Sequence, residues 1–101
     1  MINVLASISV KEGKRADFIA AFKDNLAAVR AEEGCIEYFP AVDIDADLPP
    51  QQLDENEVTV IEKWASLEAL RAHLSAPHML AYKEKVKDIV EGVSLKVLQE
   101  A

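Results

Sequence analysis

The chain is poor in the residues that build disulfide-linked, metal-bound or membrane-spanning proteins. Its 101 residues include one cysteine, Cys35, three glycines and one tryptophan. A single thiol cannot close an internal disulfide, and it excludes metal sites built from paired thiolates of one chain. No apolar run approaches the ~20 residues that a membrane helix requires, which predicts no membrane insertion. We see no signal-peptide pattern at the start, so we expect a cytoplasmic protein.

Basic charge is also scarce. Eleven Lys and Arg residues stand against 18 Asp and Glu residues, giving a net charge of −7. An acidic chain without a basic stripe repels phosphate backbones, which argues against nucleic-acid binding. Six of the acids, and no base, lie in residues 43–57, which also contain Pro49-Pro50. This acidic segment predicts a long loop, either functional or a solvated insertion.

The remaining sequence is rich enough in apolar residues, at half of the chain, to form one domain over residues 1–101. Residues 2–10 alternate apolar and small polar side chains, which predicts a strand with one buried face. Helical spacing of apolar residues predicts a helix from Arg15 to Glu33, ended by Gly34. A second helical region follows a Ser66 N-cap, restarts at Pro77 and is broken by Gly92. Further strands are predicted at residues 35–42, 58–64 and 93–97, and Pro40 places the first of these at an edge or a bulge.

This order of strand, helix, strand, strand, helix, strand predicts a ferredoxin-like α+β sandwich. The helices of such a fold cover one face of the sheet. However, Leu5, Phe39, Ile61 and Leu98 carry apolar groups in the opposite strand phase. Both faces therefore need burial, which predicts a homodimer in which a second copy supplies a partner sheet.

Chemically capable side chains gather between positions 62 and 82. This stretch holds the only tryptophan, Trp64, both histidines, His73 and His78, and Tyr82. An imidazole titrates near neutral pH and suits proton transfer with a small organic substrate. Alternatively, His73 lies on the helix surface and His78 serves in capping or packing. The spacing of the two histidines across Pro77 is unlike a regular helical pair, so we expect no metal site.

Other residues in and near this stretch are candidates for binding a substrate. Glu62 shares its strand phase with Trp64, and a buried carboxylate needs a partner. We expect that partner to be a histidine or lysine, unless Glu62 lies at the rim of the site. Tyr38, Tyr82 and Met79 are candidate pocket residues, although packing alone would also explain each of them. Trp64 suits both the core and a pocket wall.

An ordered series of short segments carries a resemblance to a known family. The segments are Glu32-Glu33-Gly34-Cys35, Tyr38 through Pro40 to Val42-Asp43, Ile61-Glu62, Trp64, His73-Leu74, Pro77-His78-Met79 and Ala81-Tyr82. Together they resemble the antibiotic biosynthesis monooxygenase (ABM) superfamily of dimeric α+β barrels, and within it the bacterial quinol monooxygenases. The resemblance covers essentially the whole chain.

The resemblance implies oxidation of a quinol or related phenol by O₂ without a metal or prosthetic group. For such a reaction we predict, from imidazole chemistry, that His73 or His78 handles the phenolic proton. Trp64 resembles in position the strand tryptophan that lines the pocket of the polyketide anthrone oxygenases, so we expect it to shape the ring site. The pocket asparagine, tyrosine and arginine of the polyketide anthrone oxygenases correspond to Val60, Leu70 and Lys83, so that polar set is largely absent. The asparagine, tryptophan and histidine of haem-degrading relatives correspond to Ala6, His73 and Lys83, which argues against haem degradation.

Two other functions remain open from the sequence. The same fold could isomerise a small keto or aldehyde metabolite, with a histidine and a carboxylate moving a proton without O₂. Alternatively, the chain could be a non-catalytic dimeric binding module whose acidic segment contacts a protein. Activity without oxygen separates the first alternative from a monooxygenase, and combined substitution of Trp64, His73 and His78 tests the second.

Overall fold

Four antiparallel strands form one sheet in the order β2-β3-β1-β4, with β1 and β3 in its centre. The computed structural model describes residues 1–101. The strands are β1 (Ile2–Val10), β2 (Cys35–Ala41), β3 (Glu57–Trp64) and β4 (Val90–Leu98). Pro40 lies in β2, which is an edge strand, as its missing N–H predicts. The order of elements confirms the predicted ferredoxin-like α+β fold.

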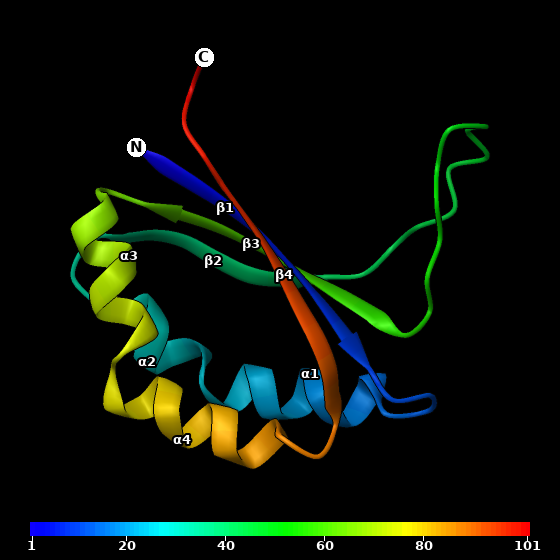
Figure 1. The fold of residues 1–101 in the computed structure, drawn as a ribbon, viewed down its shortest axis with the longest axis horizontal. Helices are drawn as coiled ribbons and strands as arrows, with labels where there is room; N and C mark the ends of the chain where they lie inside the picture. Colours follow the sequence, from blue (N-terminus) through cyan, green and yellow to red (C-terminus); the bar gives the residue numbers. More distant parts are fainter.

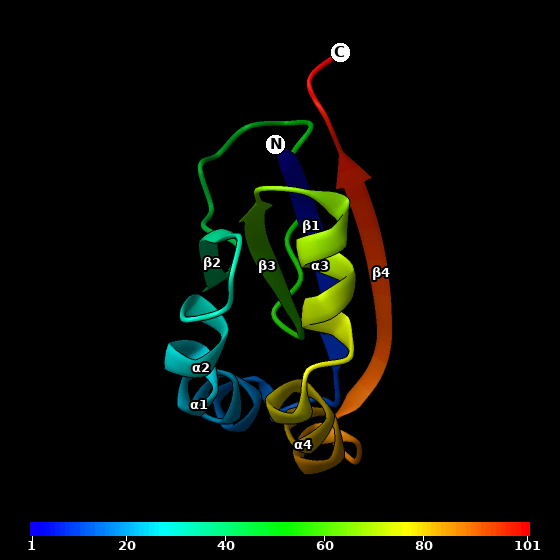
Figure 2. The same cartoon turned by 90° about the vertical axis from the view of Figure 1, so that its left-hand side faces the viewer.

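Four helices cover one face of this sheet, and none covers the other (Figures 1 and 2). They are α1 (Arg15–Asp24), α2 (Leu26–Arg30), α3 (Leu67–Leu74) and α4 (Pro77–Val86). None of them combines the length and the apolar character needed to cross a bilayer.

The prediction of one continuous helix from Arg15 to Glu33 is wrong. The helix is interrupted at Asn25, whose N–H donates to Phe22 O at 3.1 Å, and α2 ends at Arg30. Asparagine is a weak helix former, and here its side-chain amide turns to the sulfur of Met79 at 3.4 Å. Residues 31–34 consequently form a turn that leads into β2.

The second helical region begins as predicted but ends earlier. Ser66 caps α3 by accepting a hydrogen bond from Ala69 N at 3.1 Å, and Pro77 occupies the first turn of α4. The helix ends at Val86, and Gly92 lies inside β4 rather than before it. Because the pairing of β1 with β4 shifts between Ser9 and Val10, the strand accommodates this glycine without a break.

The core lies between the sheet and the helices. Val4, Ala6, Ile8 and Val10 point into it from β1, as the alternation predicted, and are all buried. The same phase of β4 is occupied by Val93, Leu95 and Val97, which pair with Ile8, Ala6 and Val4. These three side chains are nevertheless exposed, because β4 lies at the edge of the sheet beyond the helices.

The predicted acidic loop runs from Val42 to Asn56 and projects away from the helical layer (Figure 1, green). Its ends are joined by a hydrogen bond from Asp54 N to Asp43 Oδ2 at 2.7 Å. Local bonds of this kind hold the loop, and at its end Asn56 O accepts a hydrogen bond from Val10 N at 2.8 Å. No residue of this loop lines the cavity described below.

Candidate active site

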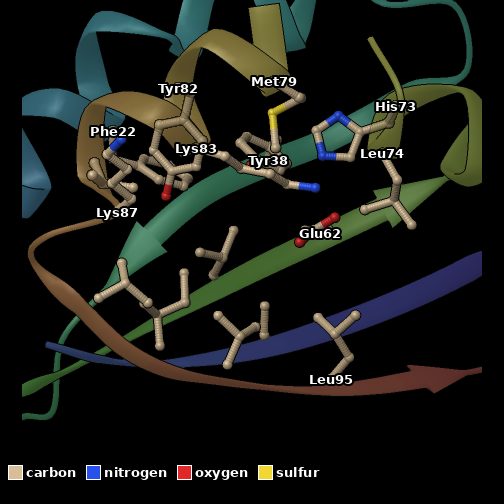
Figure 3. A pocket seen from close by; sticks show the side chains of 16 residues that line it. Phe22, Tyr38, Glu62, His73, Leu74, Met79, Tyr82, Lys83, Lys87 and Leu95 are labelled. Atoms are coloured by element: carbon tan, nitrogen blue, oxygen red, sulfur yellow. The ribbon is translucent and has the colours of Figure 1, made fainter.

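An apolar cavity of about 420 Å³ lies between the sheet and the helices (Figure 3). Its sheet side is formed by small and branched aliphatic residues, and its helical side mainly by larger, more flexible or aromatic ones. The former are Ala6, Ile8 and Val60, and the latter are Phe22, Met79, Tyr82 and Val86. Val93 and Leu95 of β4 and Leu74 of α3 complete the lining on the side where those side chains are exposed. A cavity of this size and lining suits a flat organic molecule.

The polar side chains of the lining are those of Tyr38, Glu62, His73 and Tyr82, together with the two lysines Lys83 and Lys87. His73 Nε2, Glu62 Oε2 and the two tyrosine hydroxyls make no hydrogen bond within the chain. Every side-chain nitrogen or oxygen atom that is sealed from solvent has a hydrogen-bond partner. These four atoms have none, so they are accessible from the cavity. They are therefore available to a ligand.

Glu62 is the carboxyl group of the cavity wall. Its Oε1 accepts a hydrogen bond from Trp64 Nε1–H at 2.9 Å. The predicted histidine or lysine partner is therefore wrong: the two side chains point to the same face of β3, two residues apart, so the indole reaches the carboxylate. Burial raises the pKa of Glu62 to about 7, against the lowering effect of the indole bond. Near neutral pH this group can donate or accept a proton.

His73 is held in place on two sides. Its ring lies 4.7 Å from the ring of Trp64 and 5.3 Å from the ring of Tyr38, measured between centroids. Its Nδ1 lies 2.8 Å from Glu32 Oε2. Because the carboxylate accepts the Nδ1 proton, the neutral ring presents a bare Nε2 to the cavity. Desolvation by burial lowers the pKa of His73 below its ordinary value, which favours this neutral, basic form.

Glu32 holds the second histidine as well. His78 Nε2 lies 2.7 Å from the same Oε2 atom. Glu32 comes from the turn after α2, whereas the two histidines come from α3 and α4, so the carboxylate joins three segments. Neither Glu32 nor His78 lines the cavity.

The positions of the candidate residues separate into two groups. Tyr38, Glu62, His73, Met79 and Tyr82 line the cavity. Trp64 is fully buried behind Glu62 and His73, and His78 lies on the outer side of Glu32.

Sequence reasoning missed Glu32, which contacts both histidines, and Lys87 of the cavity lining. It did not name Lys83 as a candidate either, although this residue corresponds to a pocket arginine of related oxygenases. The only signal for Glu32 was its place in the segment Glu32-Glu33-Gly34-Cys35. No three or more His, Cys, Asp or Glu side chains form a group that could hold a metal ion.

Comparison with known proteins assigns the chain to a family. The family model described as antibiotic biosynthesis monooxygenase matches residues 1–85. The chain belongs to the antibiotic biosynthesis monooxygenase (ABM) family. This confirms the resemblance inferred from the short segments and supports a monooxygenase at the level of the family.

Two curated relatives resemble this ABM protein along most of their length. The protein named probable quinol monooxygenase YgiN, from Escherichia coli K12, is 37% identical over 101 residues, covering 98% of this chain and 97% of the relative. YcnE from Bacillus subtilis, whose name proposes a monooxygenase, is 30% identical over 92 residues, covering 91% and 88%.

Solved structures support the fold. A protein from Nitrosomonas europaea, described as a proposed antibiotic biosynthesis monooxygenase, superposes with a TM-score of 0.84. The superposition covers 99% of this chain and 98% of the Nitrosomonas chain, and the two sequences are 20% identical. At this identity the likeness shows that the ABM fold is shared, and it carries no information on substrate.

Proposed function

We propose that this ABM protein is a cofactor-independent monooxygenase that oxidises a naphthohydroquinone-like quinol with O₂. The observation that carries the proposal is the free His73 Nε2 in an apolar cavity, beside a carboxyl group and two neutral phenols. The 37% identity to a protein named as a quinol monooxygenase supports the substrate class. In the reaction, one oxygen atom enters a ring C–H bond to give a hydroxyquinone. The other oxygen leaves as water with the two hydrogens that the quinol loses.

His73 is the proposed base. Its Nε2 takes the proton of one phenolic O–H, and the quinolate formed gives an electron to O₂ far more readily than the neutral quinol does. The imidazolium that results is stabilised by Glu32, which already accepts its Nδ1 proton at 2.8 Å. The same imidazolium returns its proton to the reduced oxygen when water is formed, so the reaction releases no net proton.

The remaining polar groups orient the ring. Burial raises the pKa values of Tyr38 and Tyr82, so both hydroxyls stay protonated and can donate to substrate oxygens. Glu62 can donate from its protonated form to the second quinol oxygen. Trp64 acts from behind, by holding Glu62 and packing against His73.

The uncovered sheet face supports the proposed homodimer. Leu5 of β1, Ile61 of β3 and Phe39 of β2 are cross-strand neighbours in one row on that face. Leu5 and Phe39 are 38% and 37% exposed. Pairing this face with its copy in a second subunit would bury the row and produce a dimeric α+β barrel.

The test is O₂ uptake and quinone formation by metal-stripped protein supplied with reduced naphthoquinones. We expect saturable O₂ uptake well above the uncatalysed rate, retained after chelation. A rate equal to the uncatalysed one across several quinols would overturn the proposal.

A second candidate function is isomerisation of a small keto or aldehyde compound. It is favoured by the neutral base His73 and the titratable acid Glu62 in one cavity, since such a pair can move a proton between carbon and a carbonyl oxygen. Turnover under strict anaerobiosis would support this function and exclude O₂ as a required reactant.

A further inference from the structure

The Glu32 carboxylate connects the cavity with the outer surface of the molecule. On its inner side lies His73, which is 2% exposed and lines the cavity. On its outer side lies His78, which is 28% exposed and belongs to a surface hollow shared with Asp24, Asn25 and Lys85. Glu32 itself is 13% exposed, in a second surface hollow. The three groups therefore form a continuous hydrogen-bonded path through the cavity wall.

The two histidines compete for one negative charge. Both ring nitrogens lie within 2.8 Å of a single oxygen, so the carboxylate can fully balance one imidazolium and not two. Two groups that interact this closely bind protons as a coupled pair rather than independently. Protonation of either histidine therefore disfavours protonation of the other.

We propose that Glu32 is a positioning residue that couples proton uptake by His73 in the cavity to proton release by His78 at the outer surface. This coupling rests on the proposed function, in which His73 takes a proton from the ligand. Before that step, Glu32 pairs with a His78 imidazolium. When the phenolic proton moves to His73 Nε2, His78 gives a proton to bulk water, and the group of three keeps the same net charge. When His73 returns its proton to reduced oxygen, His78 takes one back from water.

Other charged and titratable groups face this group from every packed element. Burial lowers the pKa of His73, the Glu32 carboxylate opposes this effect, and the charges of His78 and of Lys83 on α4 lower the pKa further. Cys35 and Tyr38 of β2 and Glu62 of β3 interact with the charge of Glu32, and Arg30 of α2 acts on Cys35. Asp24 and Lys85 share the surface hollow of His78. Because Glu62 titrates near neutral pH, a rate profile alone would mix its effect with that of the histidines.

The decisive experiment is therefore a histidine-resolved NMR titration of the ligand-free protein. In His78→Asn, loss of the competing cation should raise the midpoint of the His73 titration by about half a pH unit or more. In Glu32→Gln, loss of the shared charge should lower that midpoint and weaken the preference for the Nδ1–H form. Glu33→Gln removes an exposed carboxylate one residue away and should leave His73 unchanged.

Opposite shifts of the His73 midpoint in the two variants support the coupling. Unchanged midpoints, or shifts in the same direction, would overturn it. If Glu32→Gln does not fold, His78→Asn alone decides, because it leaves the Glu32–His73 contact in place. The titration needs no substrate, so its result stands apart from whether the protein oxidises quinols.

A rate measurement then connects the coupling to catalysis. In His78→Asn, the acid limb of the kcat/KM profile should move to higher pH, with about a threefold loss near pH 6 and none near pH 9. An equal loss at all pH values would indicate a merely structural role for His78 and would overturn the coupling.

Discussion

Glu32 and His73 are 41 positions apart in the chain, yet Glu32 Oε2 lies 2.8 Å from His73 Nδ1. Gly34 makes this approach possible. Its backbone has a φ of +83°, its carbonyl accepts a hydrogen bond from Ala65 N at 2.8 Å, and a Cβ at this position would lie 2.6 Å from Ala69 Cβ. The turn after α2 is thereby pressed against the start of α3, which carries His73 one turn further on.

Replacing Gly34 with alanine should separate these two segments. The added methyl group meets the Ala69 side chain, and a positive φ costs an alanine about 1–2 kcal/mol by itself. We expect a loss of about 2 kcal/mol or more in the free energy of unfolding, measured by urea denaturation, together with weaker activity.

Two other glycines serve as controls for this substitution. Gly13 has a φ of +78° with open space around it, so Gly13→Ala should show the backbone strain alone. Gly92 has neither a positive φ nor a neighbour within 4 Å, so Gly92→Ala should be close to neutral. If Gly34→Ala lowers the free energy of unfolding no more than Gly13→Ala does, the close contact between Gly34 and Ala69 is not important for stability.

His73→Gln tests the proposed base. General-base catalysis contributes about 10²–10⁴-fold to a rate, so kcat for O₂ uptake should fall at least about a hundredfold with a smaller change in KM. Arg71→Gln, on an exposed position of the same helix, is the matched control and should retain wild-type kinetics. A variant that keeps most of its kcat would exclude His73 as the base.

Glu62 should make stability depend on pH in a defined direction. Its folded pKa of about 7 exceeds the ordinary 4.5, so between these values the folded state holds a proton that the unfolded chain releases. Protonation of Glu62 therefore contributes about 3 kcal/mol to the free energy of unfolding. This contribution is fully present below about pH 4.5 and is lost as the pH rises through 7.

Glu62→Gln removes this titration while keeping an acceptor for Trp64. The free energy of unfolding of the variant minus that of wild type should therefore rise between pH 4.5 and pH 8. The lowered pKa of His73 adds an opposite dependence, but it is common to both proteins and largely cancels in the difference. A difference that does not change with pH would show that Glu62 titrates normally.

A charge placed in the apolar row of Leu5, Ile61 and Phe39, on the sheet face that no helix covers, should disturb the proposed dimer. Leu5→Lys should prevent the sheet faces from pairing, because a lysine in a buried interface is strongly unfavourable. Sedimentation velocity should then show a monomer, whereas we expect the parent chain to sediment as a dimer. Leu48→Lys, in the exposed acidic loop, is the control and should leave the assembly unchanged. A dimer in both variants would place the interface elsewhere.

The strands of the sheet, and the apolar character of both sheet faces, could be predicted because they depend on the local alternation of apolar and polar residues. Residues 2–10 show which side chains of β1 face the core, and Leu5 with Ile61 shows that the other face is also apolar. Local patterns also located the Ser66 cap and Pro77. They failed at Asn25, where a contact with Met79 from another helix competes with helix formation.

The site was only partly predictable, because its central contact is tertiary. Trp64, His73 and His78 stood out by residue type, but sequence cannot show that Trp64 lies behind the wall and His78 outside it. Glu32 looked like any acid near the end of a helix. Its importance follows from the Gly34 turn, which brings it against α3, and from two imidazoles that reach one oxygen.

The most direct test of the proposed chemistry is a single turnover of a naphthohydroquinone with ¹⁸O₂, followed by mass spectrometry of the product. A monooxygenase working through His73 should place one ¹⁸O atom in the hydroxyquinone and the other in water, with little hydrogen peroxide. An unlabelled quinone with an equal amount of peroxide would show simple autoxidation and would contradict the proposed function.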